Sequence, residues 1–334
     1  MISFLITIIK VIFLLGFLII IHEGGHFLVA KLCKVKVNEF AVGFGPVVWK
    51  KQGKETKYAI RLIPLGGFVS MEGEEERSDN KRSFSNASIS KRIAIVLAGA
   101  TVNIIFGIVV YFILMASTST YITNEIGEIY ENYPAQEIGI QQGDKIIEVN
   151  NQKINDKTDL NRTLKENEGK EANVKIERNN EEINYNITPK VDNGYYYLGV
   201  GLKKSEDTII NHIIFGVTET KEFLASIGEN LKQLLTGNIG VDQMVGPVGI
   251  GEVVSKTSGI FDFIYLLALI SLSLGITNLL PIPALDGGKI LILIIEAIRR
   301  KPMKQETESY IQLVGFTILI MLSIYVTYND IMRI

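Results

Sequence analysis

Cysteine, histidine and net charge are all scarce in this sequence. The 334 residues include one cysteine, Cys33, and three histidines, and the formal net charge is only −2. A single cysteine excludes an intramolecular disulfide and a thiolate metal cluster, so we expect Cys33 to be a small buried apolar residue. The balanced charge provides no overall attraction for DNA or RNA, which indicates that nucleic acid is not a partner.

Long apolar runs, by contrast, are abundant. Hydrophobic residues make up 47% of the chain and charged residues 21%, which excludes a disordered polypeptide. A helix needs roughly 20 apolar residues to cross a bilayer. Four segments meet this length, at 1–32, 93–116, 258–298 and 310–334. The sequence therefore predicts a polytopic α-helical membrane protein with about four transmembrane segments. The first segment lacks the small-x-small cleavage site of a signal peptide.

The charges of the connecting segments predict the orientation. Residues 33–92 contain 12 Lys/Arg and 7 Asp/Glu, a net charge of +5, whereas residues 117–257 contain 14 and 22, a net charge of −8. Short basic loops remain on the cytoplasmic side of a membrane. We therefore expect 33–92 and the basic loop 299–309 to be cytosolic, and 117–257 and both termini to be extracytoplasmic.

The acidic segment is expected to contain a domain of its own over 117–205. Short strands with a helix over 156–167 are predicted at Glu125–Tyr130, Lys145–Val149, Asn173–Glu177, Asn184–Thr188 and Tyr196–Val200. Within it, Tyr133–Asn150 contains a proline, a Gly-apolar pair, Gly-Asp and a strand that ends in Asn, an order that resembles a PDZ domain. Such domains bind a peptide end by strand addition.

The segment 206–257 completes the extracytoplasmic region. Its apolar residues over 214–235 recur at helical spacing, which predicts an amphipathic helix lying on the outer membrane surface. A glycine-rich stretch, Val245–Ile250, follows it. The third histidine, His212, lacks nearby ligand partners in the sequence, so we expect an ordinary surface or capping residue.

Two of the three histidines lie in the sequence His22-Glu23-Gly24-Gly25-His26. On a helix, residues four apart share one face, so both imidazoles can reach one Zn²⁺ ion. The adjacent Glu23 is placed to accept a proton from a zinc-activated water. Two unrelated core histidines are the alternative, but ionisable groups are costly inside a bilayer.

A catalytic zinc site requires a third protein ligand. Among the acidic residues of the membrane segments, the ligand candidates besides Glu23 are Asp262, Asp286 and Glu296. Asp286 follows Pro281 and Pro283, which break a helix at membrane depth, and is the ligand candidate. Asp262 is at the start of its span, and we expect Glu296 to pair with Arg299 or Arg300.

These motifs, in this order, resemble the bacterial site-2 proteases (the RseP/RasP group, peptidase M50 type) over essentially the whole chain. The resemblance implies that His22, His26 and Asp286 bind zinc, that Glu23 is the general base, and that Asn278 holds the substrate or the oxyanion. It also implies regulated intramembrane proteolysis in the bacterial cytoplasmic membrane. The substrates would be single-span membrane proteins that an upstream site-1-type protease has trimmed, such as an anti-sigma factor, and the PDZ domain would exclude bulky ectodomains.

Two further segments match this family less sharply. Residues 40–69 resemble its membrane-associated β segment, and Lys57–Ile63 alternates like a strand whose free edge pairs with an unwound substrate. The candidate contacts there are Tyr58, Ile60, Leu62, Gly66 and Gly67. A purely structural sheet is the alternative. Asn103 lies in a Gly-x-x-x-Asn element and is another candidate contact, unless Gly99 and Ala100 only allow close helix packing.

Two other classes of function are compatible with parts of the sequence. A membrane scaffold that uses only its PDZ domain would leave the histidine pair without a role. A zinc transporter would place more ligands along a path than three histidines supply. Neither class explains both metal motifs.

Overall fold

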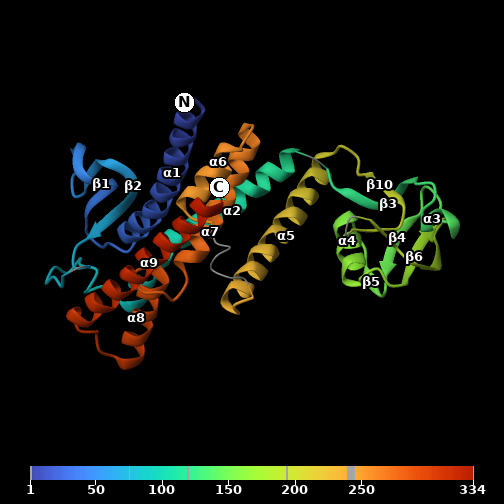
Figure 1. The fold of residues 1–334 in the computed structure, drawn as a ribbon. Coiled ribbons are helices and arrows are strands. Elements are labelled where there is room, and N and C mark those ends of the chain that lie inside the picture. Colours follow the sequence, from blue (N-terminus) through green and yellow to red (C-terminus); the bar gives the residue numbers. More distant parts are fainter. Residues whose placement is uncertain (1, 75, 119, 193–194, 239–244, 334) are drawn as a thin grey trace. The chain divides into compact units, whose positions relative to one another are not determined.

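The computed structural model describes residues 2–74, 76–118, 120–192, 195–238 and 245–333 (Figure 1). The chain divides into two compact units. One unit comprises Met1–Leu114 and Thr220–Ile334, and the other comprises Met115–Glu219. Each has its own core and is described separately.

The first unit is mainly helical. Its helices are α1 (Ile2–Leu32), α2 (Ile89–Thr118), α6 (Pro247–Ser255), α7 (Ile260–Asn278), α8 (Asp286–Arg299) and α9 (Gln305–Arg333). Four of them are long and apolar enough to cross a membrane: Phe4–Leu32, Ile89–Thr118, Ile260–Asn278 and Gln305–Arg333. Many large apolar side chains on these helices are exposed, including Phe4 and Ile324, as expected of surfaces that face lipid. The chain is a polytopic membrane protein.

Apolar side chains connect α1 to the other helices of this unit. Leu14 and Leu18 of α1 are fully buried against Val254 of α6 and against Leu266 and Leu267 of α7. A second cluster, which the half-buried Cys33 borders, joins the end of α1 to α2, α8 and the β segment. The first helix is therefore at the centre of the packing, although much of its surface is exposed.

The β segment is a doubled hairpin of β1 (Val37–Gln52) and β2 (Lys57–Met71). Both strands bend at glycines with positive φ: Gly43 and Gly45 in β1 and Gly66 in β2. The register gives Tyr58 two partners, Phe40 and Lys51, and gives Ile60 two partners, Val42 and Trp49. The expectation of a free edge along 57–63 is therefore wrong for residues 57–60, because both of their sides are already paired.

This sheet has two unpaired sides among the described residues, one at Trp49–Gln52 of β1 and the other at the end of β2. Residues Gly67–Met71 pair only with Val37–Val42 among the described residues. This segment also lies against α1, because a Cβ on Gly67 would be 3.3 Å from Cγ2 of Ile19 and 3.4 Å from Cγ of Glu23. The bends thus place an open strand edge beside the helix that carries the histidine pair.

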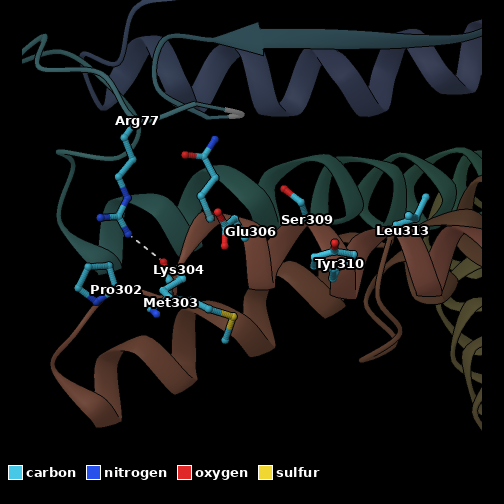
Figure 2. Close-up of a pocket in the computed structure, with 9 residues that line it drawn as sticks. Arg77, Pro302, Met303, Lys304, Glu306, Ser309, Tyr310 and Leu313 are labelled. Atoms are coloured by element: carbon cyan, nitrogen blue, oxygen red, sulfur yellow. Dashed lines mark hydrogen bonds between the residues drawn. The ribbon is translucent and has the colours of Figure 1, made fainter.

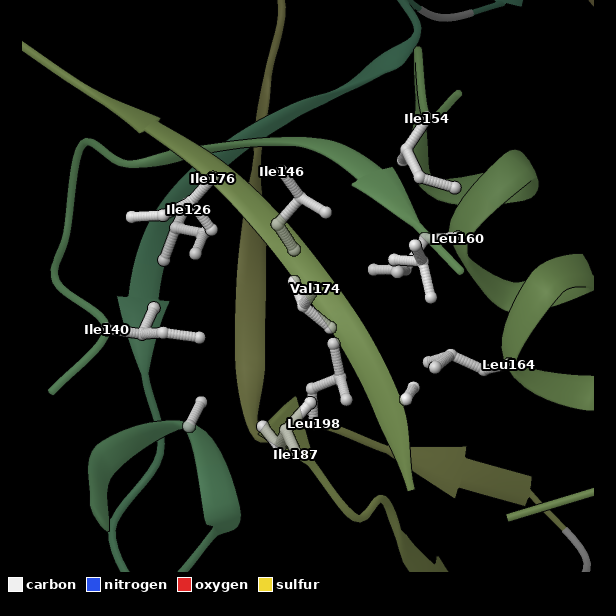
Figure 3. Close-up of a cluster of buried hydrophobic side chains, with 13 residues drawn as sticks. Ile126, Ile140, Ile146, Ile154, Leu160, Leu164, Val174, Ile176, Ile187 and Leu198 are labelled. Atoms are coloured by element: carbon white, nitrogen blue, oxygen red, sulfur yellow. The ribbon is translucent and has the colours of Figure 1, made fainter. Parts of the chain in front are cut away.

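The second unit is an antiparallel sheet with one helix in the connection from β3 to β4, another in the connection from β5 to β6, and a separate two-stranded ribbon of β8 and β9. Its elements are β3 (Ile122–Ile129), α3 (Pro134–Glu137), β4 (Lys145–Val149), β5 (Gln152–Lys153), α4 (Lys157–Glu166), β6 (Ala172–Arg178), β7 (Glu181–Ile187), β8 (Lys190–Asp192), β9 (Tyr195–Tyr197) and β10 (Val200–Lys204). The strand order is β10-β3-β4-β6-β7, with β5 beside β4. The buried core contains Ile126, Ile146, Leu160, Val174 and Ile176 (Figure 3).

The predicted strands of this unit are confirmed except for the last one. Residues Tyr196–Val200 do not form one strand, because Gly199 adopts φ +89° between β9 and β10. The helix begins one residue later than predicted, where Asp156 caps it by accepting the N–H groups of Thr158 and Asp159.

Helix α5 (Ile209–Leu235) leaves the second unit and enters the first. In the first unit, the ring of Phe223 stacks on Tyr111 of α2 with 4.0 Å between centroids and lies 6.3 Å from Tyr265 of α7. The expected amphipathic helix is therefore packed against other helices at Phe223, rather than lying only on a membrane surface. The side chain of Leu235, part of the predicted apolar face, is outside the described residues.

Candidate metal centre

The structure brings together the three residues that the sequence predicts as metal ligands. Helix α1 presents His22 and His26 one turn apart, with their Nε2 atoms 3.2 Å from each other. Oδ2 of Asp286, at the start of α8, lies 3.3 Å from Nε2 of His22 and 3.5 Å from Nε2 of His26. Residues more than 250 positions apart in the sequence thus form one triangle of potential ligand atoms.

The triangle fits a zinc ion. Ligands about 2.0–2.1 Å from a tetrahedral zinc lie about 3.3 Å from one another, close to the three distances here. His26 donates its Nδ1–H to the carbonyl of Ile95 at 2.8 Å, so its Nε2 presents a lone pair to the centre of the triangle. Oδ2 of Asp286 is buried and receives no hydrogen bond from the described residues. Such a set of electron-pair donors suits a cation.

Helix α9 supports the turn that delivers Asp286. The chain leaves α7 after Asn278 and forms α8 from Asp286, so the proline-rich segment between them is not helical. Ala284 adopts φ +72° there, and its N–H donates to the Oε1 of Gln312 at 2.7 Å. This bond compensates for a strained backbone conformation and fixes the start of α8.

A cavity of about 1570 Å³ surrounds the triangle. Glu23 and Asn278 line it together with His22, His26 and Asp286. The open strand edge also lines it, through Phe68, Val69, Ser70 and Met71. An extended peptide laid along this edge would therefore run beside the potential metal ligands and the glutamate.

The remaining predicted contacts are elsewhere. Tyr58, Ile60 and Leu62 have exposed side chains and do not line this cavity. Asn103 is fully buried where α2 meets α7, and its backbone carbonyl accepts the hydroxyl of Ser271. His212 pairs with Asp207, and Asp262 accepts hydrogen bonds from Ser258.

Sequence reasoning missed several residues at the other end of the cavity. Nζ of Lys289, one turn after Asp286, lies 2.5 Å from Oε1 of Glu74. Arg77 donates to the carbonyl of Met303 beside a hollow of about 830 Å³ that adjoins the cavity (Figure 2). These two contacts tie the loop after β2 to α8 and to the α8–α9 connection. Both charges come from segments remote in sequence, so no local pattern predicts them.

Glu296 has a different partner from the one expected. Its carboxylate pairs with Arg92 of α2 at 2.9 Å and accepts the N–H of Met303 at 2.6 Å. Glu296 is on the buried face of α8, whereas Arg299 and Arg300 are exposed. The expected pairing with Arg299 or Arg300 is therefore wrong.

Comparisons with known proteins agree with this geometry. The model described as "Peptidase family M50" matches residues 10–322. A protein of Clostridium acetobutylicum assigned as a zinc metalloprotease is 36% identical over 321 residues, which cover 95% of this chain and 94% of the relative. The regulator of sigma-W protease RasP of Bacillus subtilis is 30% identical over 418 aligned positions, which cover 98% and 99%. The zinc metalloprotease RasP of Bacillus licheniformis is 31% identical with the same coverage.

The family match extends over both metal motifs, over the second and third apolar helices, and over most of the first and the fourth. The resemblance to site-2 proteases, the zinc dependence and the protease activity predicted from the sequence are thereby confirmed. The chain belongs to peptidase family M50 and is an intramembrane zinc metalloprotease.

Proposed function

We propose that His22, His26 and Asp286 hold the catalytic zinc and that Glu23 is the general base. The observation that carries this proposal is the triangle of their Nε2 and Oδ2 atoms, with edges of 3.2–3.5 Å. Glu23 lines the same cavity and follows His22 directly. Three protein ligands leave one position for water or substrate, as in other catalytic zinc sites.

The chain's own residues account for the proton transfers of peptide hydrolysis. Zinc, when bound, polarises the scissile carbonyl and makes water acidic enough to be deprotonated near neutral pH. Glu23 accepts the proton of the attacking water and passes it to the leaving amine. Asn278, which lines the cavity, donates its side-chain amide to the substrate or to the developing oxyanion.

The substrate binds as an extended strand on Gly67–Met71. A transmembrane helix must unwind first, because its carbonyls are occupied by bonds within the helix. The unpaired side of Gly67–Met71 supplies replacement hydrogen bonds beside Glu23. Gly66 and Gly67 begin this edge. Tyr58, Ile60 and Leu62 contact the substrate only outside this cavity, away from the scissile bond, through exposed side chains, and Asn103 contacts it only if α2 and α7 separate.

The second unit is a PDZ-like domain on the extracytoplasmic side, together with both termini. Its β10 is an edge strand suited to peptide addition, and the loop charges of +5 and −8 favour this orientation. The domain excludes bulky ectodomains until an upstream protease has trimmed the substrate. The name of the Bacillus subtilis relative, regulator of sigma-W protease, supports an anti-sigma factor as the substrate.

Zinc content and cleavage, measured on the same detergent-purified preparations, test the metal and base assignments. We expect stoichiometric zinc and cleavage of a model single-span substrate in the wild type. Glu23→Gln should keep the zinc and lose cleavage, whereas His22→Ala and Asp286→Asn should lose both. Asp262→Asn is the matched control, because among the described residues this exposed carboxylate accepts hydrogen bonds only from Ser258 and Gly259. Full cleavage by Glu23→Gln, or full zinc in His22→Ala, would refute the assignments.

Cysteine cross-linking tests the substrate strand. A substrate cysteine near the scissile bond should cross-link to cysteines at Phe68 and Ser70 and much less to one at Tyr58. The reverse preference would move the binding edge to the other half of the sheet. Deletion of 120–205 tests the exclusion of bulky ectodomains, because the shortened enzyme should cleave untrimmed substrates that the full chain leaves intact.

A further inference from the structure

Helix α2, which packs against His26, has two features beside the His26 imidazole: a backbone carbonyl oxygen and a glycine, which has no side chain. Helix α2 places the carbonyl of Ile95 2.8 Å from Nδ1 of His26. One turn later, Gly99 of the same helix lies directly against the imidazole. A Cβ on Gly99 would be closer than 3.0 Å to Nε2 and Cε1 of His26 and 2.9 Å from Cε1 of His22. Real Cβ atoms essentially never approach so closely.

The imidazole has little freedom to avoid a methyl group at this position. Its Nδ1 is fixed by the Ile95 carbonyl, and its ring contacts the ring of His22 edge-on with 4.8 Å between centroids. The backbone cannot retreat easily either, because α1 and α2 touch at this level. A Cβ on Gly25 would be 2.6 Å from the carbonyl oxygen of Ala98. A side chain at 99 must therefore displace the His26 ring.

We propose that Gly99 is a positioning residue of the metal centre. The absence of a side chain at this position lets the His26 ring rest on α2, with Nδ1 on Ile95 and Nε2 directed at Asp286. Gly99 thereby has a role distinct from close packing of two helices. This inference rests on the proposed assignment of His22, His26 and Asp286 as the zinc ligands.

The variant Gly99→Ala isolates this effect. Alanine favours a helix over glycine by about 1 kcal/mol, so α2 itself is not weakened. Because groups that orient a ligand typically change metal affinity by about 10–100-fold, we expect a loss of zinc affinity in that range. Zinc affinity is measured by competition with a chromophoric chelator on the purified full chain. The absorption of the Co²⁺-substituted protein reports separately whether the ligand geometry has changed.

Two glycines of the same helices provide matched controls. A Cβ on Gly24 has nothing within 4 Å, so Gly24→Ala tests helix propensity alone. A Cβ on Gly107 of α2 would be 2.9 Å from the carbonyl oxygen of Ala268, so Gly107→Ala tests crowding between helices away from the metal ligands. Both controls should bind zinc with wild-type affinity.

The outcomes separate this inference from the assignment on which it rests. Wild-type zinc affinity and an unchanged Co²⁺ spectrum in Gly99→Ala would overturn the role of Gly99, and so would an equal loss in Gly107→Ala. If His22→Ala retains stoichiometric zinc, the ligand assignment itself fails.

A double variant covers the case in which Gly99→Ala is poorly folded. In the His26→Ala background the two closest contacts of the added methyl group are gone and Cε1 of His22, at 2.9 Å, remains, so Gly99→Ala should lower the thermal midpoint much less than it does in the wild-type background. A drop in the midpoint as large as in the wild-type background would show that crowding by other groups, and not the His26 ring, excludes a side chain at 99.

Discussion

Asp330 provides a quantitative test of how the glycine-rich stretch Val245–Ile250 is held. This aspartate of α9 is only 4% exposed. Its two carboxylate oxygens accept the N–H of Gly249 at 2.8 Å and the N–H of Gly246 at 3.3 Å, at the beginning of α6. A Cβ on Gly246 would be 2.7 Å from Oδ2 of Asp330, which explains why a glycine is required there. The carboxylate acts as a cap supplied from 80 residues away.

The energy of this cap follows from its contacts. A hydrogen bond to a charged group contributes about 1.5–3 kcal/mol, and a carboxylate beside a helix N-terminus adds about 0.3–1 kcal/mol. The 3.3 Å bond is long and is counted at the lower limit. The minimum values sum to about 3 kcal/mol, so Asp330→Ala should lower the free energy of opening α6 by at least that amount. Asp330→Asn keeps one acceptor oxygen and should lower it by about 1–2 kcal/mol.

Hydrogen–deuterium exchange of the full chain in detergent measures this change. Because 1.4 kcal/mol corresponds to a factor of ten, amides of 250–257 should exchange at least about 100-fold faster in Asp330→Ala. Ile331→Ala is the control, since the neighbouring side chain is 59% exposed, and it should leave exchange unchanged. Equal exchange in wild type and Asp330→Ala would refute the reasoning.

Three further predictions concern other parts of the chain. Burial raises the pKa of Asp144, but hydrogen bonds from Arg178 and from the N–H of Gln141 outweigh burial and hold that pKa below its usual value. The ionised carboxylate therefore stabilises the folded state. This stabilisation is complete above the unfolded pKa of about 3.9 and is lost as the pH falls through the lower folded pKa. Asp144→Asn should accordingly speed amide exchange in 139–178 at pH 7, and a difference from wild type that does not shrink below pH 4 would contradict this. Arg92→Met leaves the buried Glu296 unpaired, which should lower the thermal midpoint by several degrees, whereas Arg299→Met should not; equal midpoints for the two variants would exclude the Arg92 pairing. A strong zinc chelator should abolish cleavage and added Zn²⁺ should restore it, whereas activity that survives complete zinc removal would exclude the proposed mechanism.

The proposed metal ligands could be selected from the sequence because their side chains have recognisable metal-binding chemistry. The spacing of His22 and His26 defines one helix face, and the prolines before Asp286 mark a helix break at membrane depth. The supports of these ligands were not predictable. The carbonyl of Ile95 and the N–H of Ala284 are backbone groups, which almost every residue has. Gly99 leaves space for the His26 ring because it has no side chain. Neither kind of group leaves a local pattern.

The prediction of a free strand edge along 57–63 of the β segment was wrong for a different reason. Alternation in Lys57–Ile63 correctly predicts a strand but does not tell how many neighbours it has. Positive φ at Gly43, Gly45 and Gly66 folds each strand back on itself, so that 57–60 become interior and 67–71 become one of the two edges. The glycines were visible in the sequence, yet only the long-range register assigns them this effect.

The contacts around the cavity link the open strand edge Gly67–Met71 to Asp286, the proposed metal ligand on α8. The loop that continues from Met71 is tied to α8 through Glu74 and Lys289, and Lys289 is one helical turn beyond Asp286. Helix α8 is tied in turn to α2 through Glu296 and Arg92, and α2 carries Ile95, which orients His26. A strand added to Gly67–Met71 would therefore act on a continuous series of contacts, and this series includes both Asp286 and His26 of the ligand triangle. The substrate and the ligands would then be aligned together or not at all. This coupling favours hydrolysis of unwound segments that fit the strand edge over hydrolysis of loosely bound segments.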